Sequence, residues 1–264
     1  MEAHKLIQES RKIVVKVGSN TLAAKNGLVD LGRMENMVNQ ICAWMKEGKR
    51  VIVVSSGAGI CGTAAINKWH RKNDINYKQA LCAIGQVELM NAYKNVFDQH
   101  GVHVGQMLLT REDFEDQSRN LHIRNTLLTL VDEGVVPIIN ENDSVSVEEI
   151  KIGDNDTLAA LTANLWGADL LVLLSDIDGV YDKDPKKNPD AQLIPVVEDA
   201  AELSTRIDVH GVSDFGTGGI ATKLSAACKV NAYGIPMVLA NGSTENILKK
   251  LCGGEVPSTV FLGK

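Results

Sequence analysis

The amino-acid sequence predicts an α/β protein, specifically a three-layer αβα sandwich with a mostly parallel central sheet. Short runs of Val, Ile and Leu alternate along the chain with longer segments of helical periodicity, as in proteins whose parallel sheet is covered by helices. Aromatic residues make up only 4% of the 264 residues, so the core depends on aliphatic side chains, which suits stacked parallel strands. We find neither an internal repeat nor a linker, and we expect a single domain over residues 1–264.

The predicted strands are continuous apolar runs bounded by glycine or polar residues. The first run is β-branched and is interrupted only by Lys16, and the fourth contains Pro137 near its start, where a strand tolerates proline. We expect strands at residues 13–17, 51–54, 103–109, 135–139, 170–174, 236–239 and 258–262.

The predicted helices lie between these strands. In the first, apolar residues recur three or four positions apart from Leu31 to Met45, and Gly48 follows its end. Other helices are expected at about residues 77–99, 120–132 and 157–166, with one more between the turn at 216–219 and Gly234. We expect a small hairpin at residues 144–152. We expect a polar loop that extends away from the sheet at residues 178–192, which contain two prolines.

Composition excludes several classes of protein. The net charge is −6, and lysines and arginines are scattered, so we expect no nucleic-acid partner. The longest apolar runs, such as residues 170–174, are too short to span a bilayer, and the first residues are polar, so we expect neither a membrane segment nor a signal peptide. The five cysteines are odd in number and have no C-x-x-C spacing, which indicates free thiols in the cytoplasm and no zinc site.

Polar and glycine-rich clusters follow the predicted strands at one end. They lie at residues 16–20, 55–59, 140–143 and 175–179. In open parallel sheets, ligands bind outside the carboxyl ends of the strands. These clusters therefore predict a ligand site at that edge of the sheet.

The glycine pattern at residues 57–62 reads G-x-G-x-x-G, which alone favours a dinucleotide site. Two serines separate the preceding strand from Gly57, however, and residues 71–74 do not form the acidic strand end that such a site needs. No P-loop motif occurs. We interpret the pattern as a tight turn in which Ser56 and the Gly57 amide face an anion at a helix start.

Two lysines are candidates for phosphate binding. Gly216–Gly219 has three glycines in four residues and precedes a helix whose first turn carries Lys223. Such glycines let backbone amides approach phosphates closely. If Lys223 were only a surface lysine in a capped helix, the sequence would not require them. Lys16 ends a buried strand, where a lysine needs a partner or a ligand.

Short acids and amides gather at residues 140–143 and 154–156. Helix capping and turn formation explain such residues in part, Asp154 among them. The functional alternative is that one acid fixes the lysines and another binds a substrate ammonium. Ser175 and Asp176 follow a buried strand, and an ordinary turn explains them equally well.

Together these segments resemble the amino acid kinase family and, within it, the branch that phosphorylates free glutamate. The matching pieces occur in the family's order over nearly the whole chain. They are residues 15–19, 55–58, 105–110, 139–143, 153–156, 173–176, 179–181, 216–219 and 222–223.

The resemblance implies phosphorylation of the side-chain carboxylate of L-glutamate by ATP with Mg²⁺, the first step of proline biosynthesis. It implies that the N-terminal half binds glutamate through Ser56, Gly57, Asp143 and Asn155, and that Lys16, Asp156 and Lys223 are catalytic, with no metal-ligating side chains. It further implies a nucleotide site lined by Lys16, Ser175, Asp176, Thr217, Gly218, Gly219, Ile220, Ala221, Thr222 and Lys223.

The resemblance also implies a homo-oligomer, a dimer or a tetramer, with feedback by L-proline and coupling to glutamyl phosphate reductase. The chain ends at Lys264, just after the kinase segment, so we expect no C-terminal PUA module. Three alternatives stay open. They are another kinase of the family acting on acetylglutamate, aspartate or uridylate, a non-catalytic nucleotide or amino-acid sensor, and an oxidoreductase using the glycine pattern.

Overall fold

A computed structural model describes residues 2–22, 24, 29–66, 74–146, 155–185, 187–206 and 219–263. Its strands are β1 (Lys12–Val17), β2 (Arg50–Ser55), β3 (Val104–Leu109), β4 (Val136–Glu141), β5 (Leu170–Ser175), β6 (Val180–Tyr181), β7 (Leu193–Ile194), β8 (Val196–Val197), β9 (Met237–Asn241) and β10 (Thr259–Phe261). Eight of them form one sheet in the order β3-β4-β2-β1-β5-β9-β10-β8, while β6 and β7 form a separate pair. From β3 to β9 every neighbour is parallel, and only the β9–β10 pair of the large sheet is antiparallel.

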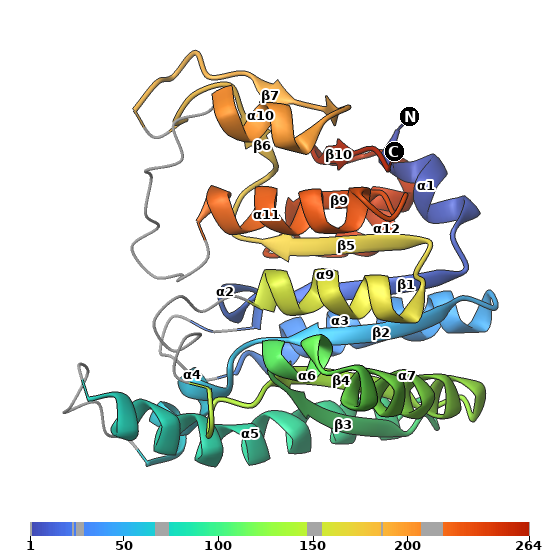
Figure 1. The fold of residues 1–264 in the computed structure, drawn as a ribbon, viewed down its shortest axis with the longest axis vertical. Coiled ribbons are helices and arrows are strands. Elements are labelled where there is room, and N and C mark those ends of the chain that lie inside the picture. Colours follow the sequence, from blue (N-terminus) through green and yellow to red (C-terminus); the bar gives the residue numbers. More distant parts are fainter. Residues whose placement is uncertain are drawn as a thin grey trace.

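Helices cover both faces of this sheet (Figure 1). Their bounds are α1 (Ala3–Glu9), α2 (Ser19–Leu22), α3 (Leu31–Lys46), α4 (Ala58–Ile66), α5 (Ile75–Asp98), α6 (Arg111–Glu115), α7 (Gln117–Asp132), α9 (Asn155–Trp166), α10 (Ala200–Arg206), α11 (Ile220–Asn231) and α12 (Ile247–Gly253). In the part of the chain that the structure describes, none of them is long and apolar enough to cross a bilayer.

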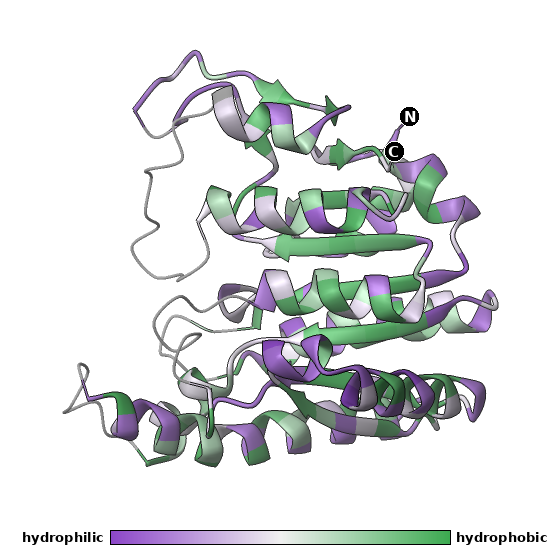
Figure 2. Cartoon of the chain, in the orientation of Figure 1, coloured by the Kyte–Doolittle hydropathy of each residue, from purple (hydrophilic) through white to green (hydrophobic). Residues whose placement is uncertain are grey.

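Two separate hydrophobic clusters show the three layers. Ile13 and Val15 of β1 pack in one cluster with side chains of α1, α3, α5 and α12. Val14 packs in the other, with side chains of α7, α9 and α11. Because side chains alternate along a strand, a fully buried strand contributes to both clusters. The central strand β5 is accordingly hydrophobic along nearly its whole length, while the covering helices mix both colours (Figure 2). The predicted αβα sandwich is confirmed.

The same alternation sets the direction of Lys16. It lies two residues after Val14 in β1, so its side chain is on the face covered by α9 and α11. Only 7% of Lys16 is exposed. β1 therefore places the buried ammonium group of Lys16 in the helix layer that contains α9 and α11.

Most element bounds agree with the sequence prediction, and the differences have physical reasons. The helix at Leu31–Lys46 is as predicted, with Asp30 accepting a hydrogen bond from the Arg33 amide at its start. β4 continues beyond its apolar run to Glu141, because β3 pairs with it along its whole length. Pro137 is tolerated inside β4 because the β2 pairing begins only at Ile138.

Other differences concern segments of weak periodicity. Helix α1 was not predicted, because its residues are mainly polar and only three of them are buried. Helix α9 begins at Asn155, two residues earlier than predicted, so that Asp156 lies in its first turn. The predicted hairpin at 144–152 lies mostly outside the described residues, which show a turn at its beginning.

Glycines set an unusually close crossing between α4 and α5. A Cβ atom on Gly62 would lie 1.8 Å from the Leu81 carbonyl oxygen, and one on Gly85 would lie 1.8 Å from the Ala58 carbonyl oxygen. Gly57, just before α4, has φ +113°, a conformation that favours glycine. The glycine pattern of residues 57–62 thus has a packing explanation: one glycine allows the turn, and another allows the helix contact.

Candidate active site

The carboxyl ends of β1, β2, β4 and β5 lie at one edge of the sheet, because these strands are parallel. The arrowheads of β2 and β5 point to the same side in Figure 1. β1 has β2 on one side and β5 on the other, so the chain order switches direction around it. Such a switch point is where open α/β sheets bind ligands. The described residues of the predicted site gather at this edge.

Two lysines share one buried aspartate at the centre of this edge. Lys16 Nζ lies 2.7 Å from Asp156 Oδ1, and Lys223 Nζ lies 3.2 Å from Asp156 Oδ2. Their side chains are 9%, 2% and 3% exposed for Lys16, Asp156 and Lys223 respectively. The three residues come from β1, the first turn of α9 and the first turn of α11, and those two helices pack against each other. The structure thus brings together the three residues predicted to be catalytic.

The electrostatics of this group favour an anion. Burial by itself would raise the pKa of Asp156, but the charges of Lys16 and Lys223, with hydrogen bonds from Lys16 and Thr222, hold its pKa well below the usual range. One carboxylate beside two ammonium groups leaves one positive charge in excess. The N-terminal ends of α9 and α11 add positive potential at the same place. The arrangement is suited to bind and neutralise a phosphate.

The start of α11 contributes the remaining described part of the predicted nucleotide segment. Thr222 Oγ1 lies 2.9 Å from Asp156 Oδ2 and 2.9 Å from the Gly219 carbonyl oxygen. Gly219 is the N-cap residue, with φ −73° and ψ −174°, and Ile220 and Ala221 follow it in the first turn. Thr217 and Gly218 lie outside the described residues. Thr222 therefore ties this turn directly to the buried aspartate.

Ser175 and Asp176 lie at the end of β5, beside the end of β9. Ser175 pairs with Asn241 in the sheet, and its hydroxyl donates to Asp176 Oδ1 at 3.0 Å. The Asn241 amide group donates to Asp178 Oδ1 at 2.9 Å. Polar side chains therefore line the edge of the sheet on the α11 side of Lys16.

A buried network of amides lies on the other side of Lys16, at the ends of β2 and β4. Asn155 Nδ2 donates to Ser56 Oγ at 2.7 Å and to Asn140 Oδ1 at 3.0 Å. Asn140 Nδ2 in turn donates to Gln86 Oε1 of α5 at 2.8 Å. The structure thus joins Ser56 and Asn155, which the resemblance assigned to glutamate, and Gly57 follows Ser56 directly.

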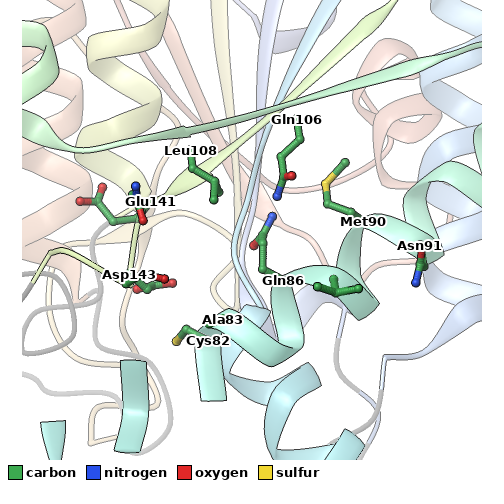
Figure 3. A pocket seen from close by; sticks show the side chains of 12 residues that line it. Cys82, Ala83, Gln86, Met90, Asn91, Gln106, Leu108, Glu141 and Asp143 are labelled. Carbon is green, nitrogen blue, oxygen red and sulfur yellow. The ribbon is translucent and has the colours of Figure 1, made fainter. Parts of the chain in front are cut away.

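Asp143 lies beside a cavity of about 370 Å³ between α5, β3 and the end of β4. Burial raises the pKa of Asp143 to about 6; a hydrogen bond from the Cys82 thiol lowers it, and the charge of Glu141 raises it further. Figure 3 shows the carboxylates of Asp143 and Glu141 on one side of the cavity and Gln86 and Gln106 on the other. The lining residues are Cys82, Ala83, Gln86, Val87, Met90, Asn91, Gln106, Leu108, Glu141, Asn142, Asp143 and Ser144.

Sequence reasoning missed two contributors from α5. Gln86 and Tyr93 are buried on the same face of this helix, seven residues apart, which is two helical turns. The Tyr93 hydroxyl lies 2.9 Å from Ser55 Oγ, next to Ser56, and Gln86 holds Asn140. The signal in the sequence was a polar glutamine among the apolar positions of the buried face, which periodicity alone does not assign to a site.

Comparisons with known proteins agree with this arrangement. The model of the amino acid kinase family matches residues 11–241. The glutamate 5-kinase of Alkaliphilus metalliredigens (strain QYMF) is 60% identical over 256 residues, which cover 97% of each chain. The glutamate 5-kinase of Treponema pallidum (strain Nichols) is 42% identical, with 97% of this chain and 98% of that protein covered. The glutamate 5-kinase of Caldanaerobacter subterraneus is 47% identical, with 95% of this chain and 68% of that protein covered.

Solved structures show the same fold at lower identity. The crystal structure of UMP kinase from Ureaplasma parvum matches with a TM-score of 0.66 and 20% identity, covering 96% of this chain and 99% of that one. UMP kinase from Bacillus anthracis matches with a TM-score of 0.65 and 18% identity, covering 97% of each chain. This likeness concerns the αβα architecture alone.

Proposed function

Because this chain belongs to the amino acid kinase family, we propose that it transfers the γ-phosphoryl group of ATP to the side-chain carboxylate of L-glutamate. Identity of 60% to a glutamate 5-kinase over nearly the whole chain supports this acceptor. The observation that carries the chemistry is the buried group of Lys16, Asp156 and Lys223, which has one positive charge in excess. Such a group suits a reaction in which two anions must approach each other.

The reaction requires alignment of the two anionic substrates more than activation of the carboxylate nucleophile. The side-chain carboxylate of glutamate has an unperturbed pKa of about 4.3, so it is ionised at neutral pH and needs no general base. One of its oxygens attacks the γ-phosphorus as the bond to the β–γ bridging oxygen breaks, which yields an acyl phosphate and ADP. The transferring group carries spread negative charge in the transition state, so fixed positive charges lower the barrier.

Each lysine has a separate part in this proposal. Lys16 would contact the acceptor and the γ-phosphate, and Lys223 would contact the leaving β-phosphate. Asp156 touches both ammonium groups and would keep them charged and directed at the phosphates. Thr222 holds Asp156 from α11, so nucleotide binding at this helix would also stabilise the aspartate.

The two substrates would occupy the two sides of β1. Ser56, Gly57, Asp143 and Asn155 would bind glutamate. Ser175, Asp176 and the segment 217–223 would line the nucleotide site. In the described residues no group of three or more His, Cys, Asp or Glu side chains is placed to hold a metal ion. We propose that Mg²⁺ enters with ATP and is held mainly by phosphate oxygens and water, as Mg²⁺ prefers.

The decisive experiment is coupled ADP release with ATP–Mg²⁺, comparing L-glutamate, N-acetyl-L-glutamate, L-aspartate and UMP as acceptors. Hydroxylamine is included because it traps an acyl phosphate as a hydroxamate. Glutamate-dependent ADP release with hydroxamate formation is the expected result. Turnover of another acceptor alone would overturn the substrate, and no turnover of any would favour a non-catalytic sensor.

Changing Asp143 to Asn is expected to raise the KM for glutamate about 10- to 100-fold and to leave the KM for ATP within a factor of two. The reason is that the ammonium group of glutamate would lose its carboxylate partner, an interaction of about 1.5–3 kcal/mol. Steady-state kinetics in both substrates measure this. Asp132→Asn is the matched control, since Asp132 is exposed and pairs with Arg50 at the opposite edge of the sheet.

The affinity for glutamate should also fall as the pH is lowered from 7.5 to 5. The pKa of Asp143 is about 6, so this carboxylate is mostly ionised at pH 7.5 and mostly protonated at pH 5. Since only the ionised form pairs with an ammonium group, the KM for glutamate should rise roughly tenfold between these pH values. The measurement is KM at saturating ATP–Mg²⁺ from pH 5 to 8. An equally steep rise in Asp143→Asn would assign the titration to another group.

Three further features of the proposal rest on family resemblance. They are a cytoplasmic homo-oligomer (a dimer or a tetramer) formed by a single kinase domain over residues 1–264, feedback inhibition by L-proline, and transfer of the labile acyl phosphate to glutamyl phosphate reductase. Size-exclusion chromatography with light scattering tests the first, and inhibition of ADP release by L-proline tests the second.

A further inference from the structure

One face of α5 forms a wall of the cavity between α5, β3 and the end of β4. Cys82, Gln86 and Met90 lie four residues apart on this helix, and all three line the cavity. Side chains at this spacing stand one above the other on a helix. The volume of about 370 Å³ is within the range of pockets that bind small molecules. A thiol and an amide therefore share the wall of a space large enough for a ligand.

The Gln86 amide has a buried donor without a partner. The Glu141 backbone N–H donates to Asn140 Oδ1, so Asn140 offers Gln86 its NH₂ group, which Gln86 accepts with Oε1. Gln86 is 7% exposed, and its Nε2 has no hydrogen-bond partner among the described residues. Figure 3 shows the Gln86 amide directed toward Gln106 along the cavity. A buried NH₂ group without an acceptor is unfavourable, so it indicates a ligand that brings an acceptor such as a carboxylate.

The Cys82 thiol lies at the acidic end of the same wall. It donates a hydrogen bond to Asp143, and the charge of Glu141 acts on that carboxylate. Cys82 is partly exposed and is not part of a disulfide. Its Sγ lies close to α4, since a Cβ atom on Gly59 would be 3.4 Å from it. A group with an ammonium near Asp143 and a carboxylate near Gln86 would complement the charges and donors around this thiol.

We propose that Cys82 is a modification site for small disulfides of amino acids, of which L-cystine is the simplest. In the mixed disulfide, the ammonium group of the attached half faces Asp143 and Glu141, and its carboxylate accepts a hydrogen bond from Gln86 Nε2. This inference goes beyond the phosphoryl transfer proposed above, and formation of the mixed disulfide does not require that activity.

The step is a thiol–disulfide exchange. The Cys82 thiol passes its proton to Asp143, which already accepts its hydrogen bond, and the thiolate attacks one sulfur of L-cystine. The sulfur–sulfur bond of L-cystine breaks as the bond to Cys82 Sγ forms, and the departing L-cysteine takes up the proton. Cys82 is thereby oxidised to a mixed disulfide, and L-cystine is reduced to one thiol. Because such modifications are reversible by thiols, Cys82 would respond to the thiol–disulfide balance.

The test compares three disulfides at equal concentration. L-cystine carries ammonium and carboxylate groups, cystamine carries ammonium groups alone, and dithiodiglycolate carries carboxylates alone. Mass spectrometry of the intact protein and of its peptides gives the rate of addition at Cys82. Each rate is divided by the rate at Cys82 in the unfolded protein, which removes the intrinsic reactivity of the reagent. The resulting ratio should be at least about tenfold higher for L-cystine than for dithiodiglycolate, on the scale of one hydrogen bond to a charged group.

Gln86→Glu tests the part of the amide. It keeps an acceptor oxygen for Asn140 and removes the donor, so the ratio for L-cystine should fall about tenfold. The ratio for cystamine should not fall, because cystamine has no carboxylate. Should Gln86→Glu fail to fold, Gln86→Leu removes the same donor and gives the same comparison. Asn91→Ala is the matched control, since it removes another amide of α5 that lines this cavity, and it should leave all ratios within a factor of two.

Two results would overturn the inference. One is a ratio for L-cystine no higher than that for dithiodiglycolate. The other is an equal fall in the ratios for L-cystine and cystamine in Gln86→Glu, which would show that Gln86 only supports the local structure. Both readouts are masses, so they decide the inference whether or not the protein phosphorylates glutamate.

An effect on activity rests on the proposed function, in which Asp143 binds the ammonium group of glutamate. The attached half of L-cystine would occupy Asp143, so glutamate-dependent ADP release should be lost on modification and restored by dithiothreitol. In Cys82→Ser this activity should be the same with and without L-cystine. Modification of Cys82 without loss of activity would leave the modification site standing and remove Asp143 from glutamate binding.

Discussion

Replacing Lys16 with alanine is expected to lower kcat by about a hundredfold or more, on the scale of removing one preorganised charge stabiliser. Lys16 Nζ is held at 2.7 Å from Asp156 by a strand buried on both faces, so it is already in place before the substrates bind. Without it, Asp156 and Lys223 together carry no net charge, and the excess positive charge that would face the transferring phosphoryl group is gone.

Lys12→Ala is the matched control for this experiment. Lys12 lies on the same face of β1 as Lys16 but at the opposite end of the strand, where it contacts the Trp166 ring and donates to the Trp166 carbonyl oxygen. Its loss should affect the stability of the fold while kcat stays within a factor of two. The measurement is kcat at saturating glutamate and ATP–Mg²⁺. A normal kcat in Lys16→Ala would remove Lys16 from the chemistry.

The sequence allowed the layers of the fold to be predicted because each layer has a local signature. A buried parallel strand is a short aliphatic run, and a covering helix repeats its apolar residues every three or four positions. Lys16 could be identified as a site residue for the same reason, since a charge inside an aliphatic run requires a partner. That partner, Asp156, is 140 positions away along the chain, and no local pattern connects the two.

Other parts of the site depend on contacts that leave little trace in the sequence. Asn140 is the penultimate residue of β4 and not part of a loop, because pairing with β3 extends the strand beyond its apolar residues. Gln86 reaches Asn140 from a helix that begins eleven residues earlier in the chain, at Ile75. The roles of the substrate and nucleotide residues stay predictions, while the fold and the family are confirmed.

Gly85→Ala is expected to be strongly destabilising, although the substitution is small and would favour a helix elsewhere. The added Cβ atom would lie 1.8 Å from the Ala58 carbonyl oxygen and 2.2 Å from the Gly62 amide nitrogen. Both are backbone atoms, so no side-chain rotation removes the clash and α4 must move away from α5. We expect a loss of about 3 kcal/mol, the upper end of the usual cost of overpacking, or roughly 6–12 °C in Tm for a chain of this size.

Gly59→Ala is the matched control, because Gly59 lies in α4 and belongs to the same G-x-G-x-x-G pattern. Its added Cβ atom would lie 3.4 Å from Cys82 Sγ, close to an ordinary contact with a side chain. Thermal unfolding should therefore separate the two variants, with Gly59→Ala within about 2 °C of the unchanged protein. Similar Tm values for the two variants would show that the stability of the fold does not depend on the close crossing of α4 and α5. The predicted contrast assigns the glycine pattern to helix packing, which in turn fixes the positions of Ser56, just before α4, and Gln86, next to Gly85 in α5.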